Sequence, residues 1–434
     1  MNILNSLKRN LYIAKKNIYP LNRSITGKGT LKTLQIIKKR LPKLKIKKVK
    51  SNTNVYDWKV PPEWNLRQAY ILDKNRKKII DFEKNNLHIV GYSKPVNKYV
   101  SKKELLKHLH TLPKQKNAIP YVTSYYKKYW GFCSTDLEKK KIRKNYNNKD
   151  KFKVVIDSFF NSKGNLNYGE LIIPGKSKQE ILISTYICHP SMANNELSGP
   201  IVSMTLAEHF SKIKNLKKTF RFIFIPETIG SISYIKKNYD HLKSNVVGGY
   251  NLTCIGDDRM HSCMFTKYSN TISDKALRSA YKILRIKYKK HSFLKRGSDE
   301  RQFNSPGVDL PIASIFRTKY GEYPEYHTSL DDFKLVTIQG LYGGLKVVLK
   351  AIEMILSQIY PKNLILCEPH MSKRKLYPTI SKKNTNYFSD HIMDFLQYAD
   401  GKNSLNEISI FIGKNIKLTK RICDFLLKKK IIEI

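Results

Sequence analysis

Three short, almost continuous apolar runs constrain the fold of this 434-residue chain more than any other feature. They read GELIIPG, EILISTYICHP and TFRFIFIPETIG, and they begin at residues 169, 180 and 219. Strands of this kind are buried on both faces of a sheet, because a strand with one solvent-exposed face shows alternating apolar and polar residues. A helical segment, GPIVSMTLAEHFSKIKN, separates the second run from the third. The pattern predicts an α/β domain in which helices flank a mixed sheet.

Two other parts of the chain have a different texture. From about residue 42 to 160 the runs are short and rich in aromatic and β-branched residues, as in KKIIDF and YVTSYYKKYWGFC, with Pro, Asn and Gly between them. This predicts a small β-rich module. From residue 389 onward, three short stretches with apolar residues at helical spacing precede an apolar strand at 431–434. That order is the layout of a winged helix.

The chain is strongly basic, with 81 Lys and Arg against 34 Asp and Glu and a formal net charge of +47. Such an excess is typical of proteins that bind nucleic acid, anionic lipid or acidic polymers. Here it is mostly Lys spread through every region beside many Asn, Ile and Tyr, which share A/T-rich codons, so it indicates a basic surface rather than a dedicated patch. Six cysteines without a CxxC pair indicate neither a disulfide framework nor a zinc ribbon. With no secretory or membrane-spanning run, we expect a soluble, cytoplasmic protein.

Polar residues follow the predicted strands, at the sheet edge where active sites of open α/β sheets collect. His189 ends the second run, and Asn195 and Glu196 follow it just before the helix that begins near Gly199. An imidazole and a side-chain oxygen at this spacing can converge on one cation. The alternative is that His189 closes the strand and the Asn-Asn-Glu loop caps the helix.

Glu227 follows the third run directly. A carboxylate at a buried strand end has a raised pKa and can act as a general base. The alternative is a carboxylate that interacts with the backbone amides of a helix N-terminus. The stretch NLTCIGDD places Asp257 and Asp258 at the end of a further strand, where acidic turn residues are also common.

The stretch RGSDERQFNSPGVDLPIASIFRTKYGEYPEYHTSLDDF, at 296–333, is the richest in candidates. Asp299 and Arg301 lie in its first polar loop, Arg317 follows the strand IASIF, and Tyr326 and His327 precede the last carboxylates. His327 offers a second imidazole, and the two arginines are candidate clamps for a carboxylate or another anion. A surface salt bridge is the alternative reading for each charged residue in this stretch.

These stretches, together with YPLNRSITGKG, VYDWKVPPEWN, IPYVTSYY, CHPSMANNELSGP, PETIGS and YPTIS, give the chain a family resemblance from about residue 20 to 434. It resembles bacterial aminopeptidase-like proteins that are often described as polysaccharide biosynthesis proteins with an aminopeptidase-like domain. The resemblance implies a zinc-aminopeptidase-like α/β domain at 1–52 and 163–365. It also implies an inserted β-rich domain at 53–162 and a winged helix at 366–434.

The resemblance also implies which residues form the site. His189 and His327 match the two metal-binding histidines of co-catalytic zinc aminopeptidases, and Glu227 matches the general base. The remaining ligand positions carry neutral residues: Asn195 stands at the bridging aspartate, Thr228 at the second glutamate and Thr253 at the later aspartate. Neutral side chains are poor replacements for the carboxylates that two divalent ions need, so these departures from the family pattern favour one zinc ion over two.

We expect this zinc ion to be held by His189, His327 and one carboxylate, with Glu196 ahead of Asp257 and Asp299. The residues expected to bind substrate are Asn195, Asp299, Arg301, Arg317 and Tyr326.

Two functions are consistent with these residues. The first is a metal-dependent hydrolase that cleaves an amide bond in a peptide or an amino-sugar-type substrate, with a metal-activated water and Glu227 as its base. The second is a catalytically degenerate protein that binds a glycan or peptide and uses its winged helix for interaction with protein or DNA. DNA binding is the less favoured use, because the charge of the last helix matches the basic background. We expect no membrane partner.

Overall fold

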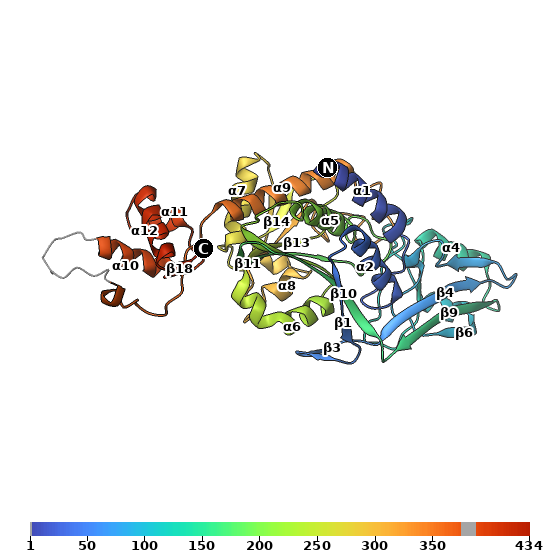
Figure 1. Ribbon diagram of the computed structural model, residues 1–434. Helices are drawn as coiled ribbons and strands as arrows, with labels where there is room; N and C mark the ends of the chain where they lie inside the picture. The colour runs from blue at the N-terminus through green and yellow to red at the C-terminus, as the bar shows by residue number, and fades with distance from the viewer. Residues whose placement is uncertain (1, 375–387) are drawn as a thin grey trace. The chain divides into compact units, whose positions relative to one another are not determined.

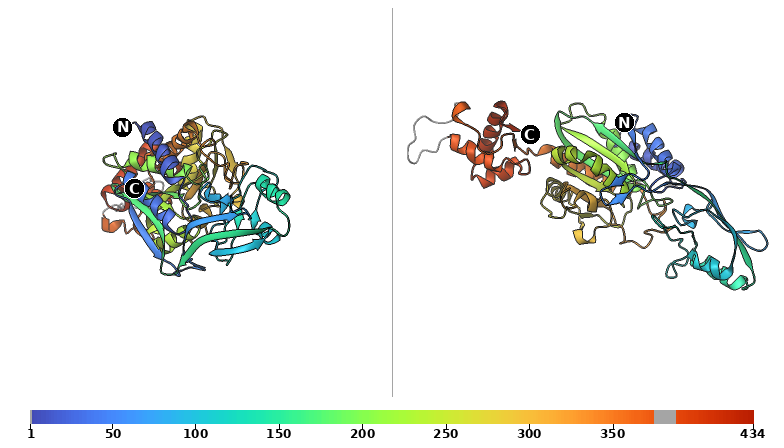
Figure 2. Two further views of the ribbon diagram at one scale, coloured as in Figure 1. Left: turned by 90° about the vertical axis from the view of Figure 1, so that its right-hand side faces the viewer. Right: turned by 90° about the horizontal axis from the view of Figure 1, so that it is seen from below.

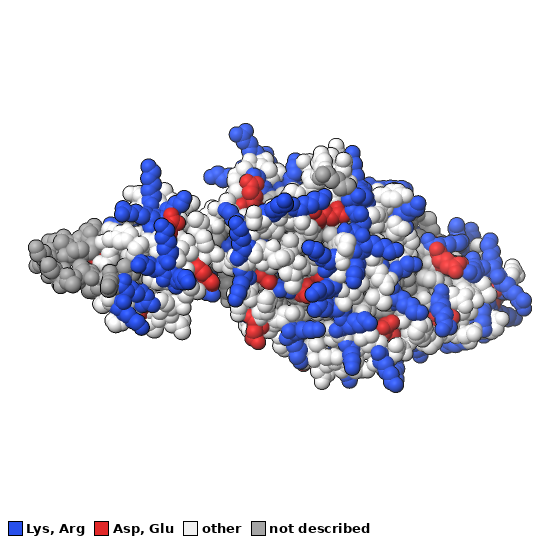
Figure 3. Space-filling view, in the orientation of Figure 1, with Lys and Arg blue, Asp and Glu red and all other residues white. Residues whose placement is uncertain are grey.

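The computed structural model describes residues 2–374 and 388–434, so the YPTIS stretch lies outside the described residues. The chain forms two compact units, Met1–Lys350 and Ala351–Ile434 (Figure 1). None of the described helices is both long and apolar enough to cross a membrane. On the face that Figure 3 shows, Lys and Arg are spread over each unit, with few Asp and Glu between them.

An eight-stranded mixed sheet forms the centre of the first unit, in the order β1-β10-β12-β11-β13-β16-β14-β15. The central strands β12, β11, β13 and β16 are parallel, whereas β10 is antiparallel to both β1 and β12, and β14 is antiparallel to β16. The predicted mixed sheet is therefore confirmed. Its strands are β1 (Lys45–Lys50), β10 (Asn165–Ile173), β11 (Ser177–Tyr186), β12 (Lys218–Ile225), β13 (Val246–Leu252), β14 (Ser262–Met264), β15 (Lys289–His291) and β16 (Ile312–Phe316).

Helices cover this sheet, with α5 and α9 on one side and α6 on the other in Figure 1. Helix α5 is buried along almost its whole length, because α1 covers the face that does not pack on the sheet. This explains why its sequence is apolar nearly all round. The helices of this part are α1 (Ile3–Ile13), α2 (Lys28–Arg40), α5 (Ser198–Phe210), α6 (Ile229–Asn245), α7 (Ile272–Ile283), α8 (Glu300–Phe303) and α9 (Ile338–Ser357).

Between β1 and β10 the chain forms a second, antiparallel sheet in the order β5-β4-β9-β6, which Figure 2 shows apart from the large sheet. It has its own core, which includes Phe132, Phe152 and Val154. The β-rich texture predicted for this segment is thus present, with two short helices added. Its elements are β2 (Asn54–Val55), β3 (Trp58–Lys59), β4 (Glu63–Leu72), β5 (Lys78–Asp81), β6 (Val96–Ser101), α3 (Lys102–Lys107), β7 (Leu109–His110), β8 (Phe132–Cys133), α4 (Asp136–Asn145) and β9 (Lys151–Asn161).

The second unit has the predicted winged-helix layout of three helices and a terminal strand. Ser404 and Glu407 form a capping box at the start of the second helix, and Asn415 caps the third, which fixes where both begin. Ile392, Phe395, Ile408, Ile422 and Leu426 form its core. The elements are β17 (Lys362–Asn363), α10 (Phe388–Tyr398), α11 (Leu405–Phe411), α12 (Ile416–Lys428) and β18 (Ile432–Glu433), and β17 pairs with β18.

A buried ion network ties three neighbouring strands of the large sheet together. Arg221 on β12 is 4% exposed, and it donates two hydrogen bonds to Glu180 on β11, at 2.6 and 2.9 Å. It donates a third to Glu170 on β10, at 2.6 Å. Because one guanidinium serves two buried carboxylates, a shift of any of these strands by one residue would leave buried charges unpaired.

We expect Arg221→Met to lower the free energy of unfolding by about 3–5 kcal/mol, because it removes the one buried cation that Glu170 and Glu180 share. Their other basic partners, Lys47 at 3.8 Å from Glu170 and His241 at 2.9 Å from Glu180, are both partly exposed. Urea unfolding followed by tryptophan fluorescence measures this, since all three tryptophans of the chain lie in the first unit. Arg67→Met is the control: Arg67 is 71% exposed and pairs with Asp157 at 3.8 Å, so it should cost less than about 1 kcal/mol. Equal losses in the two variants would contradict the role of the network.

Candidate active site

Three parallel strands deliver the central residues of the site. In the pairing of β11 with β12, Tyr186 lies opposite Ile225, and in the pairing of β11 with β13, Ser184 lies opposite Asn251. His189 follows β11, Glu227 follows β12, and Thr253 follows β13 directly. The carboxyl ends of neighbouring parallel strands meet at one edge of the sheet, so these segments converge there, as the sequence predicted.

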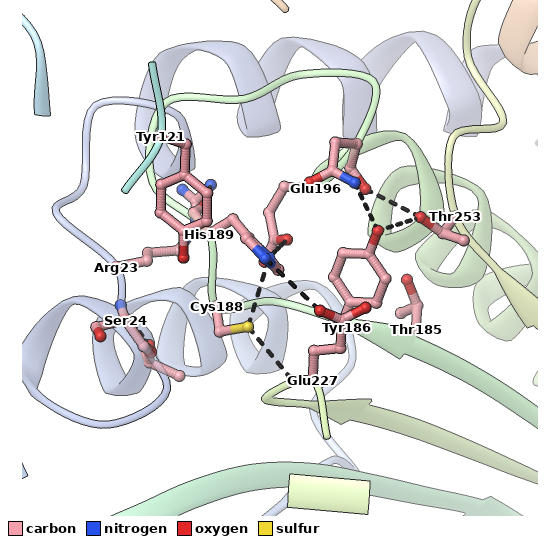
Figure 4. A network of polar contacts seen from close by, with 12 residues as sticks. Arg23, Ser24, Tyr121, Thr185, Tyr186, Cys188, His189, Glu196, Glu227 and Thr253 are labelled. Carbon is pink, nitrogen blue, oxygen red and sulfur yellow. Dashed lines mark hydrogen bonds and ion pairs between the residues drawn. The ribbon is translucent and has the colours of Figure 1, made fainter. Parts of the chain in front are cut away.

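His189 lies between two carboxylates (Figure 4). Its Nδ1 is 2.6 Å from Oε2 of Glu196, and its Nε2 is 3.7 Å from Oε2 of Glu227. Burial by itself would lower the pKa of His189, but the neighbouring Cys188 and Glu196 outweigh it and raise that pKa well above its usual value. Glu196 therefore holds the ring by one nitrogen and leaves the other nitrogen facing Glu227.

Glu227 is held in place by a strained turn between β12 and α6. The next residue, Thr228, has φ 63° and ψ −82°, a conformation that a β-branched residue rarely adopts. Asp299 stabilises it by accepting hydrogen bonds of 2.8 Å from the Thr228 amide and from the Ser231 hydroxyl. Burial raises the pKa of Glu227, and burial together with the charge of Glu227 raises the pKa of Asp299 to about 7. Strain and raised carboxyl pKa values are both typical of catalytic sites.

A neutral, fully buried network fills the space beside His189. The hydroxyl of Tyr186 is hydrogen-bonded to the Thr253 hydroxyl and accepts a 2.8 Å hydrogen bond from the Asn195 side-chain nitrogen. Asn195 and Thr253 are the positions where the family resemblance places two metal-binding aspartates. The three side chains are at most 2% exposed. A tyrosine hydroxyl thus joins two neutral groups where a second ion would need carboxylates, so this donor set does not fit a two-ion centre.

One carboxylate fixes the loop that carries Asn195 and Glu196. The backbone amides of Ala193, Asn194 and Asn195 donate to Asp331, at 3.2, 2.5 and 2.9 Å. A carboxylate that receives three amides holds the loop rigidly against the segment that follows His327. The two chemistry-bearing loops, near residues 190 and 330, therefore share one anchor.

Arg23 supports the same loop from the N-terminal segment. It is 1% exposed and donates to the backbone carbonyls of Ile18 and His189, the latter at 2.6 Å. Burial lowers the pKa of Arg23, and the charge of Glu196 is the largest influence that opposes this. A buried arginine without an ion pair to a carboxylate is costly. Its position behind His189 indicates that its positive charge balances the carboxylates of the site.

The segment at 119–126, from the β-rich part of the chain, covers the second histidine. Pro120 forms a β-bridge with Thr328, and the amide of Tyr121 donates to the carbonyl of His327 at 2.9 Å. The ring of Tyr121 lies edge-on to His189 and His327, at 5.0 and 5.1 Å. Tyr326 stacks on His327 at 3.9 Å. Burial and the charge of His189 lower the pKa of His327 to about 3, so this ring is neutral near pH 7.

A cavity of about 390 Å³ opens onto Glu227 and His189. Cys188, Thr228 and Arg301 complete its polar side. Its apolar side contains Ile25 and Ile229, and residues 58, 125 and 126 from the β-rich segment add three aromatic rings. The site is therefore formed by both parts of the first unit, with chemistry at the sheet edge and an aromatic wall facing it.

The described residues contain one group of three potential metal ligands: Cys188, His189 and Glu196, whose ligand atoms lie within 4.8 Å of one another. Oε1 of Glu196 is buried and has no hydrogen-bond partner among the described residues. Thiolate, imidazole and carboxylate are ligands that zinc accepts. The residues present therefore fit one ion, with His327 next to them at a ring distance of 5.4 Å from His189.

The structure brings together most of the predicted site residues and separates the others. His189, Glu196, Glu227, Asp299, Arg301, Tyr326 and His327 all lie at or directly behind the cavity. Asn195 is 2% exposed and belongs to the network of Tyr186, so it does not line the cavity as a substrate-binding residue would.

Asp257 and Arg317 do not reach the cavity, in contrast to the prediction. Asp257 accepts hydrogen bonds from the amides of Thr318 and Arg259 and from the side chains of Asn194 and Thr318. Both of its oxygens are thereby used to join loops. Arg317 is hydrogen-bonded to His261 instead of pointing to an open site. Both residues follow strands, but their side chains turn into the protein between the loops.

Several residues of the site had no predicted role. Cys188, Tyr186 and Arg23 contact the His189 loop, while Tyr121 and Trp58 come from the β-rich segment. Arg23 lies in YPLNRSITGKG, Trp58 in VYDWKVPPEWN and Tyr121 in IPYVTSYY, three stretches that carry the family resemblance. Their place in these stretches was the signal in the sequence that could have pointed to these residues. Nothing in the stretches themselves indicates a contact with a residue more than 60 positions away along the chain.

Comparisons with known proteins agree with this architecture. The profile of the family described as "Domain of unknown function (DUF4910)" matches residues 12–358, and a winged helix-turn-helix profile matches 358–434. A Clostridium acetobutylicum protein named "Putative polysaccharide biosynthesis protein with aminopeptidase-like domain" is 40% identical over 426 residues, which cover 98% of this chain and 96% of that protein. The resemblance predicted from the sequence is confirmed.

Two solved structures share the fold. The crystal structure of a "putative peptidase" from Clostridium acetobutylicum has a TM-score of 0.78 at 39% identity and covers 99% of this chain and 98% of that one. The zinc aminopeptidase BSAP from Bacillus subtilis has a TM-score of 0.59 at 13% identity, covering 80% of this chain and 94% of that one. The second likeness shows that the α/β unit has a zinc-aminopeptidase-like fold.

We expect Tyr186→Phe to lower the free energy of unfolding by about 1–3 kcal/mol, because it leaves Asn195 and Thr253 buried without their shared partner. Urea unfolding measures the loss. Tyr99→Phe is the matched control, since Tyr99 is 67% exposed and should change stability by less than about 0.5 kcal/mol. A Tyr186 variant as stable as the control would show that the neutral network contributes nothing.

Proposed function

The chain belongs to the family of the domain of unknown function DUF4910, and from this premise we propose that it is a hydrolase that cleaves an amide bond with Glu227 as general base. The observation that carries the proposal is the placement of Glu227. Its carboxylate lies at the end of a buried strand, lines a cavity of about 390 Å³ and faces Nε2 of His189 at 3.7 Å. A carboxylate so placed, with a raised pKa, is suited to accept a proton near neutral pH.

The roles of the chain's own residues follow from their contacts. Glu227, whose side chain is 20% exposed, takes the proton of the attacking water and returns it to the leaving nitrogen. Asp299 and the strained Thr228 fix the direction in which the Glu227 carboxylate points. Glu196 fixes the ring of His189, so that its free nitrogen stays on the side of the cavity. These contacts hold the base before substrate arrives, which is how preorganised sites gain rate.

We also propose that the site holds a single zinc ion, with Cys188, His189 and Glu196 as its nearest ligands and His327 beside them. The donor chemistry and the unpartnered Oε1 of Glu196 support one ion. When bound, such an ion polarises the carbonyl of the substrate and lowers the pKa of a bound water. In the absence of the ion, Cys188 is a protonated thiol near pH 7, because burial raises the pKa of Cys188 to about 11.

Cys188 is not the nucleophile of a cysteine hydrolase. In such an enzyme the thiol is hydrogen-bonded to one ring nitrogen of a histidine, and a carboxylate is hydrogen-bonded to the other ring nitrogen. Here Cys188 Sγ lies 3.5 Å from Nδ1 of His189, the same nitrogen that Glu196 occupies. The geometry therefore favours Glu227 over Cys188 as the reacting group.

Replacement of Glu227 by Gln should reduce amide hydrolysis about a hundredfold or more, since it removes the base and keeps the shape of the side chain. The assay measures release of p-nitroaniline from aminoacyl and N-acylaminoacyl anilides and of acetate from N-acetylated amino sugars. Glu83→Gln, an exposed glutamate of the β-rich segment, is the control and should retain full activity. Full activity of the Glu227 variant, or no hydrolysis by the wild type, would refute the proposal.

Elemental analysis of protein purified without chelator should find about one zinc per chain. His189→Ala and Glu196→Gln should lose this metal, whereas His391→Ala, in the second unit, should keep it. The reason is that the first two remove ligands of the only three-residue donor group among the described residues. No metal in the wild type even after incubation with zinc would rule out the proposed ion without touching the role of Glu227.

A further inference from the structure

The cavity beside Glu227 has an aromatic wall that the sheet edge does not supply. Trp58 and Tyr126 both line it, and both rings are unusually open, at 42% and 54% exposure. Their centroids lie 6.1 Å apart and the ring planes meet at 62°. Large rings left open at the mouth of a cavity offer flat apolar surface to a ligand.

This wall is held rigidly. The hydroxyl of Tyr126 donates to the carbonyl of Lys59 at 2.9 Å, which ties the ring to the β2–β3 hairpin that carries Trp58. Lys236 on α6 donates to the carbonyl of Asn54 at 3.0 Å and fixes the hairpin to the sheet domain. Rigid aromatic side chains lose little conformational entropy when they bind a ligand.

Arg301 supplies a positive charge to the lining of the cavity. Its side chain donates to the Thr228 hydroxyl at 2.6 Å, and within the described residues it has no ion pair with a carboxylate. Its Nε is buried, so only the terminal nitrogens can reach a ligand, and Nη1 donates no hydrogen bond within the described residues. A guanidinium with unused donors at the edge of a cavity is suited to bind a carboxylate or another oxyanion.

From these contacts we infer that the cavity recognises a substrate with an oxyanion, such as a carboxylate, attached to a ring or other flat apolar group. Arg301 binds the oxyanion, and the rings of Trp58 and Tyr126 pack against the flat face. The inference rests on the proposed function in one respect, since it names the class of substrate that Glu227 would hydrolyse.

The same arrangement disfavours a free amino terminus. An aminopeptidase must bind the ammonium group of its substrate, which requires a carboxylate in addition to the general base close to the reacting carbonyl. Glu227, the proposed base, is the one acidic residue among the described residues that line the cavity. The family resemblance places a second glutamate at position 228. This chain has Thr228 there, and its hydroxyl accepts a hydrogen bond from the guanidinium of Arg301. The protein therefore accepts amides that carry negative charge in preference to peptides with a free amino group.

Binding to wild type and to Glu227→Gln, measured by tryptophan fluorescence and calorimetry, tests this inference without turnover. Two pairs of probes isolate the charge: methyl glucuronoside against methyl glucoside, and 3-phenylpropionate against 3-phenylpropanamide. Each acid should bind at least about tenfold tighter than its neutral partner. Phenylalaninamide, which carries the free ammonium group, should bind most weakly. Whether the glucuronoside or the phenylpropionate binds more tightly shows whether the cavity prefers a sugar acid or an aromatic acid.

Arg301→Gln should abolish the preference for the acids, whereas Arg296→Gln, an exposed arginine five residues earlier, should keep it. Trp58→Ala should weaken acids and neutral probes alike. No preference of the wild type for either acid, tighter binding of phenylalaninamide, or a preference that survives Arg301→Gln would each overturn the inference. Because the wild-type comparison needs no variant, a misfolded Arg301 protein would not leave the question open. If the hydrolysis assay shows that Glu227 is not the base, these binding results still stand, because they do not depend on turnover.

Discussion

The parallel pairing of β11 with β12 and β13 is the constraint on which the rest of the site depends. It places the ends of three buried strands at one edge, and each of those ends carries a residue of the site: His189, Glu227 or Thr253. The Arg221 network fixes β11 against β12 at the level of the strands themselves. Because a slip of one residue would turn the side chains to the opposite face, the register of these strands sets the chemistry.

Charge is divided sharply within a small volume around His189. On one side, the carboxylates of Glu196 and Glu227 flank His189, Asp299 accepts from the Thr228 amide, and Arg23 donates to the His189 carbonyl. On the other, Tyr186 joins neutral side chains in a network that holds no formal charge. A two-ion centre would need carboxylates on both sides. The neutral side chains at these positions hydrogen-bond through the Tyr186 hydroxyl instead, and Oδ1 of Asn195 stays buried without a partner among the described residues.

The β-rich segment is part of the site rather than an attachment to it. It covers His327 with Tyr121 and forms the wall of the cavity with Trp58 and Tyr126. The sheet edge supplies the reacting groups, and the segment inserted between β1 and β10 supplies the surface against which a substrate would pack. A fold shared with a zinc aminopeptidase does not by itself fix the substrate, which depends on the residues that line the site.

The sequence by itself determined the order of strands and helices, the three-helix unit at the C-terminus and the strand-end positions of His189 and Glu227. These features follow from local hydrophobic periodicity and from the rule that loops at strand ends carry function. Only the tertiary structure decided which nitrogen of His189 faces which carboxylate. It also turned Asp257 and Arg317 away from the cavity and brought Trp58 to it. The same packing placed Arg23 on the His189 loop and Tyr121 against the rings of His189 and His327. Those outcomes depend on how segments far apart in the chain pack together, and periodicity within one segment carries no information about that packing.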